Sequence, residues 1–177
     1  MSAERNTILI KNVASITVCL NVLFLSYFQA YKLINFILSS YLFVDLFHTT
    51  KPDFIIHHLS TLGFLYSTRN VPLKSFYPQA PAMINLEIST VFLAIDALVT
   101  EQVLKLPKWL VYLNQALFTV TFTKFRIWDY FWRILIVNEY PNGGTKTAVL
   151  TLFLLDCYWF YLICRRLKKT ILNTKNA

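Results

Sequence analysis

The stretch KPDFIIHHLSTLGFLYS, residues 51–67, combines a helix-start signal with an apolar run that contains two adjacent histidines. Pro52 and Asp53 stand where a helix begins, because proline fits the first helical turn and an acid there complements the helix dipole. The run from Phe54 to Ser67 carries no Lys, Arg, Asp or Glu. It therefore predicts a helix in an apolar environment, in which the two histidines are costly polar groups.

Five further apolar runs lie on either side of this segment: Val13 to Tyr31, Leu33 to Phe47, Ala82 to Thr100, a run from Trp109 to about Val137, and Ala148 to Cys164. A membrane-spanning helix needs about twenty residues, with about 17 to 25 tolerated. Only 15% of the residues are charged, against about a quarter in soluble domains. We predict an all-α, polytopic transmembrane bundle of about six helices, folded as one domain with its core over about residues 10–170.

The net charge of +8 is concentrated at the ends of the apolar runs and in the C-terminal tail. With six spans, ten cations fall on the side of the N-terminus and four on the other side. Cations favour short cytosolic loops, so both termini are predicted to be cytosolic. This distribution is typical of a membrane protein and argues against nucleic acid as a partner.

The three cysteines, Cys19, Cys157 and Cys164, lie inside apolar runs and show no CxxC or Cys/His spacing. They predict neither a disulfide framework nor a zinc site. Two adjacent histidines with distant acids also lack the usual spacing of metal ligands. We predict no metal and no resident cofactor.

Polar residues of different runs fall at similar depth if neighbouring helices are antiparallel. Counting from the loops places Asp45 near His57 and His58, and places Asp96 level with His57 to within about one turn. Adjacent helical residues point about 100° apart, so the two histidines face different neighbours or a cavity between them. Thr61 lies one turn beyond His57 on the same face. The expectation is one polar layer toward the cytosolic side.

A histidine paired with a carboxylate in an apolar site can act as a base or nucleophile, because the carboxylate fixes the imidazole tautomer. The alternative is that both histidines are structural. Two interpretations of Glu87 have equal weight: it is a catalytic acid, or it is an ion-pair partner of Arg126. Arg126, Asp129 and Arg133 are spaced three and four apart, which favours an ion-pair ladder along one helix.

Several segments resemble the TLC domain, the membrane domain of ceramide synthases and several lipid-related proteins. The segment from Lys51 to Leu62 looks like the His-His motif of that family, and Tyr41 to Asp45 resembles its Tyr-x-x-x-Asp segment. Leu86 to Thr90 resembles the Glu-x-Ser-Thr segment of the branch that lacks synthase activity. Phe125 to Ile127 and Tyr158 to Ile163 also fit. The matches occur in the family's order and cover nearly the whole chain.

The resemblance implies a helical bundle around a lipid-sized cavity, in the endoplasmic reticulum or a related endomembrane. By analogy with ceramide synthases, His57 and His58 would be base or nucleophile in acyl transfer from acyl-CoA to a lipid amine. Asp45, or an acid of the fourth run, Glu87 or Asp96, would orient them. The candidate substrate-binding residues are Thr61, Tyr41 and Arg126.

The chain also departs from the synthases. They carry paired aspartates after the His-His motif, whereas this chain has Glu87 and, at a different spacing, Asp96. Three functions follow as hypotheses: a lipid-binding or membrane-composition regulator, an acyltransferase with acyl-CoA as co-substrate, and a small transporter. The expected partners are membrane lipids, with a homo- or hetero-oligomer left open.

Overall fold

The computed structural model describes residues 3–27, 30–68, 80–132 and 143–175, with the side chains of 3–4, 80–84 and 169–175 left aside. Over these residues the fold is helical and contains no strand, which confirms the all-α prediction. The helices are α1 (Ala3–Tyr27), α2 (Tyr31–Leu46), α3 (Pro52–Thr68), α5 (Ala80–Thr100), α6 (Lys108–Thr121), the π-helix η1 (Phe122–Asp129) and α7 (Gly143–Lys175).

Each predicted apolar run overlaps a helix, but the ends differ by a few residues to about three turns. The first run was predicted over Val13 to Tyr31, whereas α1 begins at Ala3 and ends at Tyr27, and Tyr31 begins α2. The third run, Phe54 to Ser67, lies within α3, which begins at Pro52 with Asp53 in its first turn, as the sequence predicts. The sixth run is the middle of α7, because the helix continues into the basic tail. The fifth run is α6 continued by η1, and its predicted end near Val137 lies outside the described residues.

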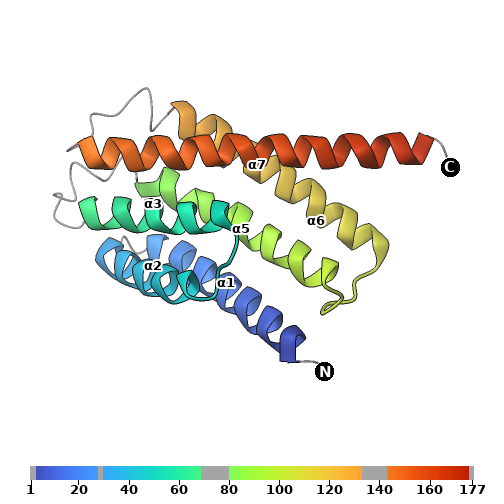
Figure 1. The fold of residues 1–177 in the computed structure, drawn as a ribbon, viewed down its shortest axis with the longest axis horizontal. Helices are drawn as coiled ribbons and strands as arrows, with labels where there is room; N and C mark the ends of the chain where they lie inside the picture. The colour runs from blue at the N-terminus through green and yellow to red at the C-terminus, as the bar shows by residue number, and fades with distance from the viewer. Residues whose placement is uncertain (1–2, 28–29, 69–79, 133–142, 176–177) are drawn as a thin grey trace.

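The chain runs back and forth along one axis, so that both ends of the chain lie at the same end of the bundle (Figure 1). The α2–α3 and α5–α6 connections lie at that end too. We call it the terminal end.

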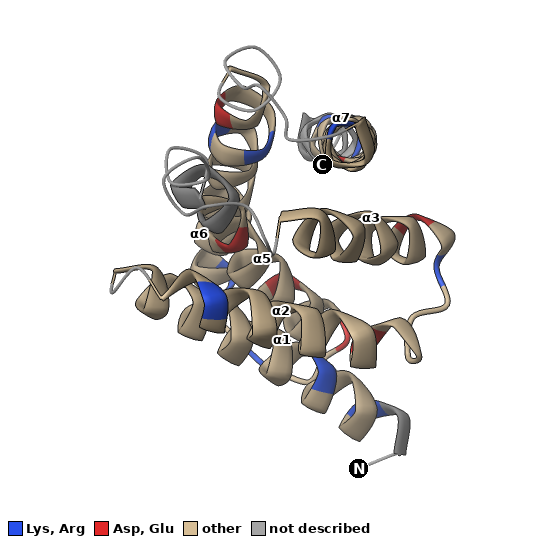
Figure 2. Ribbon diagram, turned by 90° about the vertical axis from the view of Figure 1, so that its left-hand side faces the viewer, with Lys and Arg blue, Asp and Glu red and all other residues tan. Residues whose placement is uncertain are grey.

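The helices pack in a ring around the middle of the molecule (Figure 2). α1 packs against α2 and α5, α3 against α2 and α7, and η1 joins α5, α6 and α7. Among the described residues, the largest buried apolar cluster links α2, α3, α5, α7 and the residue that follows η1, through Leu42, Phe64, Leu86, Leu152 and Tyr130. Tyr130 is fully buried and donates a hydrogen bond to the Val149 carbonyl at 3.1 Å.

Within the described part of the chain, two helices are long and apolar enough to cross a membrane, α1 over Arg5–Tyr27 and α7 over Gly143–Lys168. α2 and α3 have 16 and 17 residues, at or below the lower limit for a span. Six spans therefore remain a prediction, whereas the all-helical bundle is established.

Candidate functional site

The middle of the bundle holds a cavity of about 490 Å³. Residues from α1, α2, α3, α5, α6, η1 and α7 line it. Most of the side chains singled out from the sequence lie on its wall: Tyr41, Asp45, His57, His58, Thr61, Glu87 and Arg126. Asp96 does not. Sequence reasoning thus located residues of one internal cavity, although it misjudged how some of them pair.

Asp45 and His58 form the contact that the sequence predicted. Both side chains are buried, and His58 Nε2 lies 2.6 Å from Asp45 Oδ2. An ionised carboxylate only accepts hydrogen bonds, so His58 Nε2 is the donor in this contact. Lys11 Nζ lies 3.1 Å from Asp45 Oδ1, which joins α1 to the α2–α3 pair.

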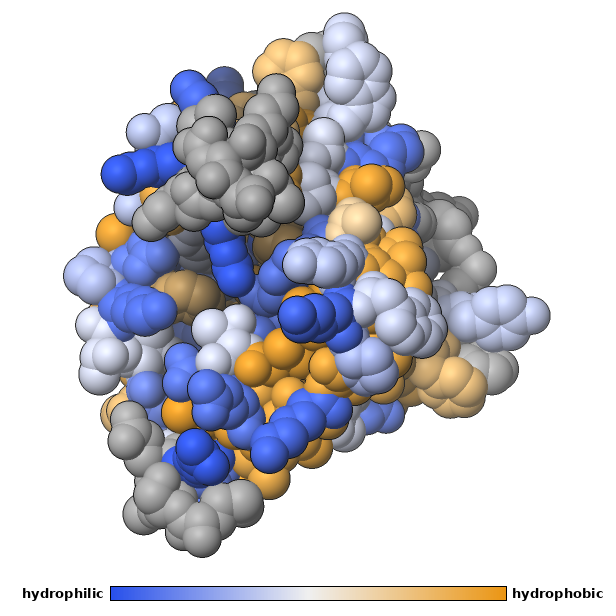
Figure 3. All heavy atoms as spheres, turned by 90° about the vertical axis from the view of Figure 1, so that its right-hand side faces the viewer, coloured by the Kyte–Doolittle hydropathy of each residue, from blue (hydrophilic) through white to orange (hydrophobic). Residues whose placement is uncertain are grey.

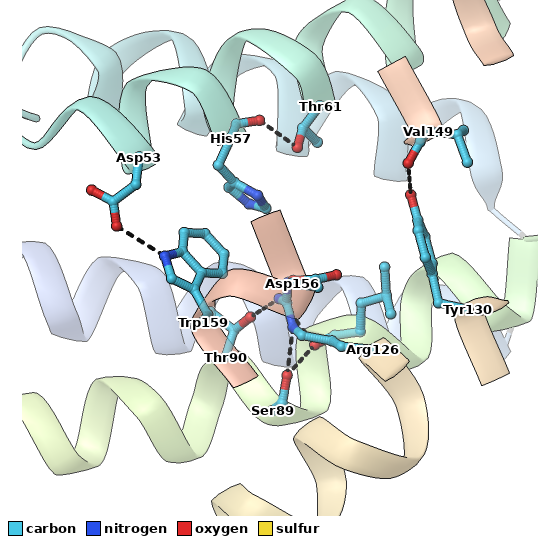
Figure 4. Close-up of polar contacts among 11 residues, drawn as sticks. Asp53, His57, Thr61, Ser89, Thr90, Arg126, Tyr130, Val149, Asp156 and Trp159 are labelled. Carbon is cyan, nitrogen blue, oxygen red and sulfur yellow. Dashed lines mark hydrogen bonds and ion pairs between the residues drawn. The ribbon is translucent and has the colours of Figure 1, made fainter. Parts of the chain in front are cut away.

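His57 points toward Trp159 of α7 (Figure 4), and its ring centroid is 5.7 Å from that of His58. The centroid of the His57 ring is 5.2 Å from that of Trp159, whose Nε1 donates to Asp53 Oδ2 at 2.9 Å. Thr61 donates to the His57 carbonyl within α3 at 2.8 Å, so its hydroxyl is held by its own helix. The two histidines face different neighbours, as expected, although the second neighbour is α7.

Both histidines keep one unsatisfied nitrogen. The Nδ1 atoms of His57 and His58 are buried and have no hydrogen-bond partner among the residues that the structure describes. Buried polar atoms are nearly always paired, so each exception calls for an explanation such as a bound ligand or a chemical role. These atoms are the first reason to regard the cavity as functional.

Arg126 is buried in a second polar cluster on the cavity wall (Figure 4). It forms a 3.0 Å ion pair with Asp156. Its Nε donates to Ser89 Oγ at 2.8 Å, and NH2 donates to Thr90 Oγ1 at 2.9 Å. Arg126 therefore connects η1 to α5 and α7, and its guanidinium is largely used in holding the bundle.

The structure corrects two predicted pairings of this arginine. Its carboxylate partner is Asp156 rather than Glu87, which accepts a hydrogen bond from Cys19 Sγ at 3.1 Å. The predicted ion pair between Arg126 and Asp129 is also wrong, because Asp129 pairs with Lys124 at 2.5 Å. Arg133, the other member of the predicted ladder, lies outside the described residues.

Asp156 is the site residue that sequence reasoning missed. It is the only acidic residue between Ala148 and Cys164, and an isolated charge inside an apolar run marks a buried partner or a functional group. Applied to the sixth run as it was to the others, this signal would have identified Asp156.

Asp96 belongs to a different cluster. It accepts from Gln115 Nε2 and from Arg166 NH1, both at 3.1 Å. The prediction that it lies level with His57 is wrong, because α3 ends at Thr68 and α5 begins at Ala80. Asp96 is therefore 16 residues from its helix end and His57 is 11 from its own. At about 1.5 Å per residue, Asp96 lies further toward the terminal end.

Comparison with known proteins adds no assignment. No family model, curated protein or solved structure matches this chain. The TLC resemblance therefore remains a prediction drawn from the motifs. The function is inferred from the cavity and the residues that line it.

Proposed function

We propose that this chain is a multi-pass membrane protein of TLC type that holds a lipid inside its helical bundle. It would act in lipid homeostasis in the endoplasmic reticulum or a related endomembrane, as a lipid-binding or membrane-composition regulator. The observation that carries the proposal is the cavity of about 490 Å³. Its volume is in the range of about 300–1,000 Å³ common for ligand sites, and its wall is largely apolar with a few convergent polar groups, as in such sites.

The outer surface supports a membrane location. Large apolar side chains are exposed on successive helices, including Phe24 (63%), Phe36 (69%), Tyr66 (65%), Trp109 (65%) and Leu154 (60%). Soluble monomers rarely expose contiguous apolar patches above a few hundred Å². Side chains of this kind are stable when they face lipid, so a bundle in the bilayer accounts for them.

The test is native mass spectrometry of protein purified in a mild detergent. Ala97→Phe adds a ring at a cavity-lining position, whereas Ala116→Phe adds the same ring on the exposed side of α6. We expect bound lipid on the wild type and on Ala116→Phe, with occupancy reduced severalfold on Ala97→Phe. A wild type that is folded but free of lipid, in every detergent that preserves it, would refute the proposal.

The Asp45–His58 pair favours acyl transfer as a second candidate. His58 Nδ1 could take the proton of an amine as its nitrogen attacks the thioester carbonyl of an acyl-CoA. The C–N bond forms, the C–S bond breaks, and the proton passes to the departing thiolate.

A second assay tests this candidate: acyl-CoAs and long-chain bases should give an amide with the wild type. The His57→Ala/His58→Ala variant should give none, and unchanged product from it would exclude the two histidines.

A further inference from the structure

The terminal end of the bundle carries an excess of exposed positive charge. It is formed by the start of α1, the α2–α3 and α5–α6 connections with the helix starts that follow them, and the end of α7 (Figure 1). Seen end-on, much of this face is covered by hydrophilic side chains (Figure 3). Seven described cations in these segments have exposed side chains: Arg5, Lys51, Lys105, Lys108, Arg165, Arg166 and Lys168.

The acids at the same end are fewer and lie deeper. Of the four whose side chains are described, only Glu101 is exposed. The other three are buried or half-buried and already accept hydrogen bonds or ion pairs: Asp45, Asp53 and Asp96. Arg166, the partner of Asp96, keeps 63% of its side chain exposed. Lys11, half-buried beside Asp45, is the eighth described cation of this end, so the outward face is strongly positive.

Aromatic side chains are exposed among these cations. Trp109 and Tyr112, both 65% exposed, follow Lys108 at the start of α6. Tyr161, which is 60% exposed, lies one turn before Arg165 on α7. Trp and Tyr beside Lys and Arg are typical of the level of the lipid headgroups, because such rings have an apolar body and a polar edge. An acidic soluble protein or a nucleic acid would account for the charge but not for these rings.

The exposed cations are spread around the terminal end and are not gathered in one pocket. They come from segments that are far apart in the sequence, and of the seven only Lys51 lines the cavity. Cations distributed over one face fit a plane of anionic headgroups better than they fit a single small anion. Clusters of about 4–8 Lys and Arg beside a membrane span are typical of proteins that bind anionic lipids.

We infer that the terminal end is a docking surface for the headgroups of anionic glycerophospholipids. The phosphates and carboxylates of the headgroups lie among the lysines and arginines, and the rings of Trp109, Tyr112 and Tyr161 lie at the same depth. The surface fixes the bundle against the leaflet that is richer in anionic lipid. This inference rests on the membrane location in the proposed function, and it concerns a different lipid from the one held in the cavity.

Lipid titration followed by native mass spectrometry can test the preference. The protein in a neutral detergent is titrated with phosphatidylserine or with phosphatidylcholine of the same acyl chains, and the apparent Kd of the first lipid adduct is measured for each. We expect phosphatidylserine to bind at least about fivefold more tightly, since one Lys or Arg near an anionic surface strengthens binding by about that factor. The preference should shrink as the salt concentration rises, because salt screens exposed charges.

Paired charge removals locate the surface. Two double variants each remove two exposed cations of the terminal end: Lys105→Gln/Lys108→Gln and Arg165→Gln/Lys168→Gln. Each should weaken phosphatidylserine binding about fivefold or more and leave phosphatidylcholine binding little changed. The matched control, Lys32→Gln/Lys146→Gln, removes two exposed cations from the starts of α2 and α7, at the opposite end. It should leave both affinities unchanged.

The cavity variant Ala97→Phe separates this inference from the proposed function. It should keep the preference for phosphatidylserine, and loss of the preference in this variant would place the anionic lipid in the cavity and overturn the inference. Equal affinity for the two lipids, or an equal loss in the control variant, would also overturn it. Binding of a soluble polyglutamate peptide without any lipid preference would assign the surface to an acidic protein instead. A preference for phosphatidylserine in a wild type that holds no co-purified lipid would support the inference and count against the proposed function.

Discussion

At the scale of single residues, the interior of the bundle depends on a few polar pairs of very different burial. Arg126 and Asp156 have side chains that are 8% and 2% exposed, whereas Arg166 in its pair with Asp96 is 63% exposed. Removing one partner of a buried pair leaves an uncompensated charge, which costs about 3–5 kcal/mol. Exposed pairs typically contribute less than about 1 kcal/mol.

Arg126→Met is therefore expected to lower the free energy of unfolding by about 3–5 kcal/mol, and Arg166→Met by less than about 1 kcal/mol. Adding Asp156→Leu to Arg126→Met should recover most of the loss, because no buried charge then remains. Equilibrium unfolding in detergent micelles measures the free energy of unfolding of all three variants. Equal effects of Arg126→Met and Arg166→Met would contradict the pairing described here.

His58 offers a second comparison at this scale. The amide of His58→Gln can still donate to Asp45, whereas His58→Leu leaves that carboxylate without one of its donors. A buried acceptor that loses its partner costs about 1–3 kcal/mol. We expect His58→Leu to be less stable than His58→Gln by about that amount in thermal unfolding. If both variants matched the wild type, the Asp45–His58 contact would have no structural role.

At the scale of helices, residue pattern predicted position along the axis better than it predicted neighbours. Asp45 meets His58 because α2 and α3 are joined by the short connection that the depth count assumed. Asp96 does not meet His57, because the 69–79 connection made the count uncertain and α3 packs against α7 rather than closing on α5. Depth can be counted across a short connection such as α2–α3, whereas the count fails between α3 and α5, and the direction in which each helix face points depends on packing.

α7 provides a prediction about an element. Its 33 residues extend over about 50 Å, longer than the hydrocarbon core of about 30 Å, and the helix projects past its neighbours (Figure 1). The basic run at its C-terminal end begins at Arg165, which is exposed. In lipid nanodiscs, backbone amides after Arg165 should exchange with deuterium much faster than those of 145–160. Uniform protection along α7 would mean that the tail is covered.

At the scale of the whole molecule, the sequence predicted an all-helical chain and several polar residues of the cavity wall. It could not predict the ring order of the helices, because each apolar run is compatible with several neighbours. The pairing of Arg126 with Asp156 follows from that order, since η1 meets α7 only in the folded bundle. The prediction that both termini are cytosolic still depends on the cation count of the sequence alone.

Cysteine labelling in sealed vesicles tests this topology. In a background without the three native cysteines, Thr50→Cys and Glu101→Cys should react with an impermeant maleimide from the side of the N-terminus. Lys146→Cys should react from the opposite side. All three positions are exposed. Reaction of all three from one side would exclude the proposed insertion.

Photo-crosslinking in a membrane tests the central claim, that a lipid chain occupies the cavity, most directly. A fatty acid with a diazirine near its methyl end is added to nanodiscs containing the protein, irradiated, and mapped by peptide mass spectrometry. We predict adducts on the apolar wall residues Phe64, Leu65 and Leu152. These adducts should be lost when unlabelled fatty acid is added in excess. Adducts confined to outward-facing residues such as Phe36 and Leu154, undiminished by competitor, would contradict it.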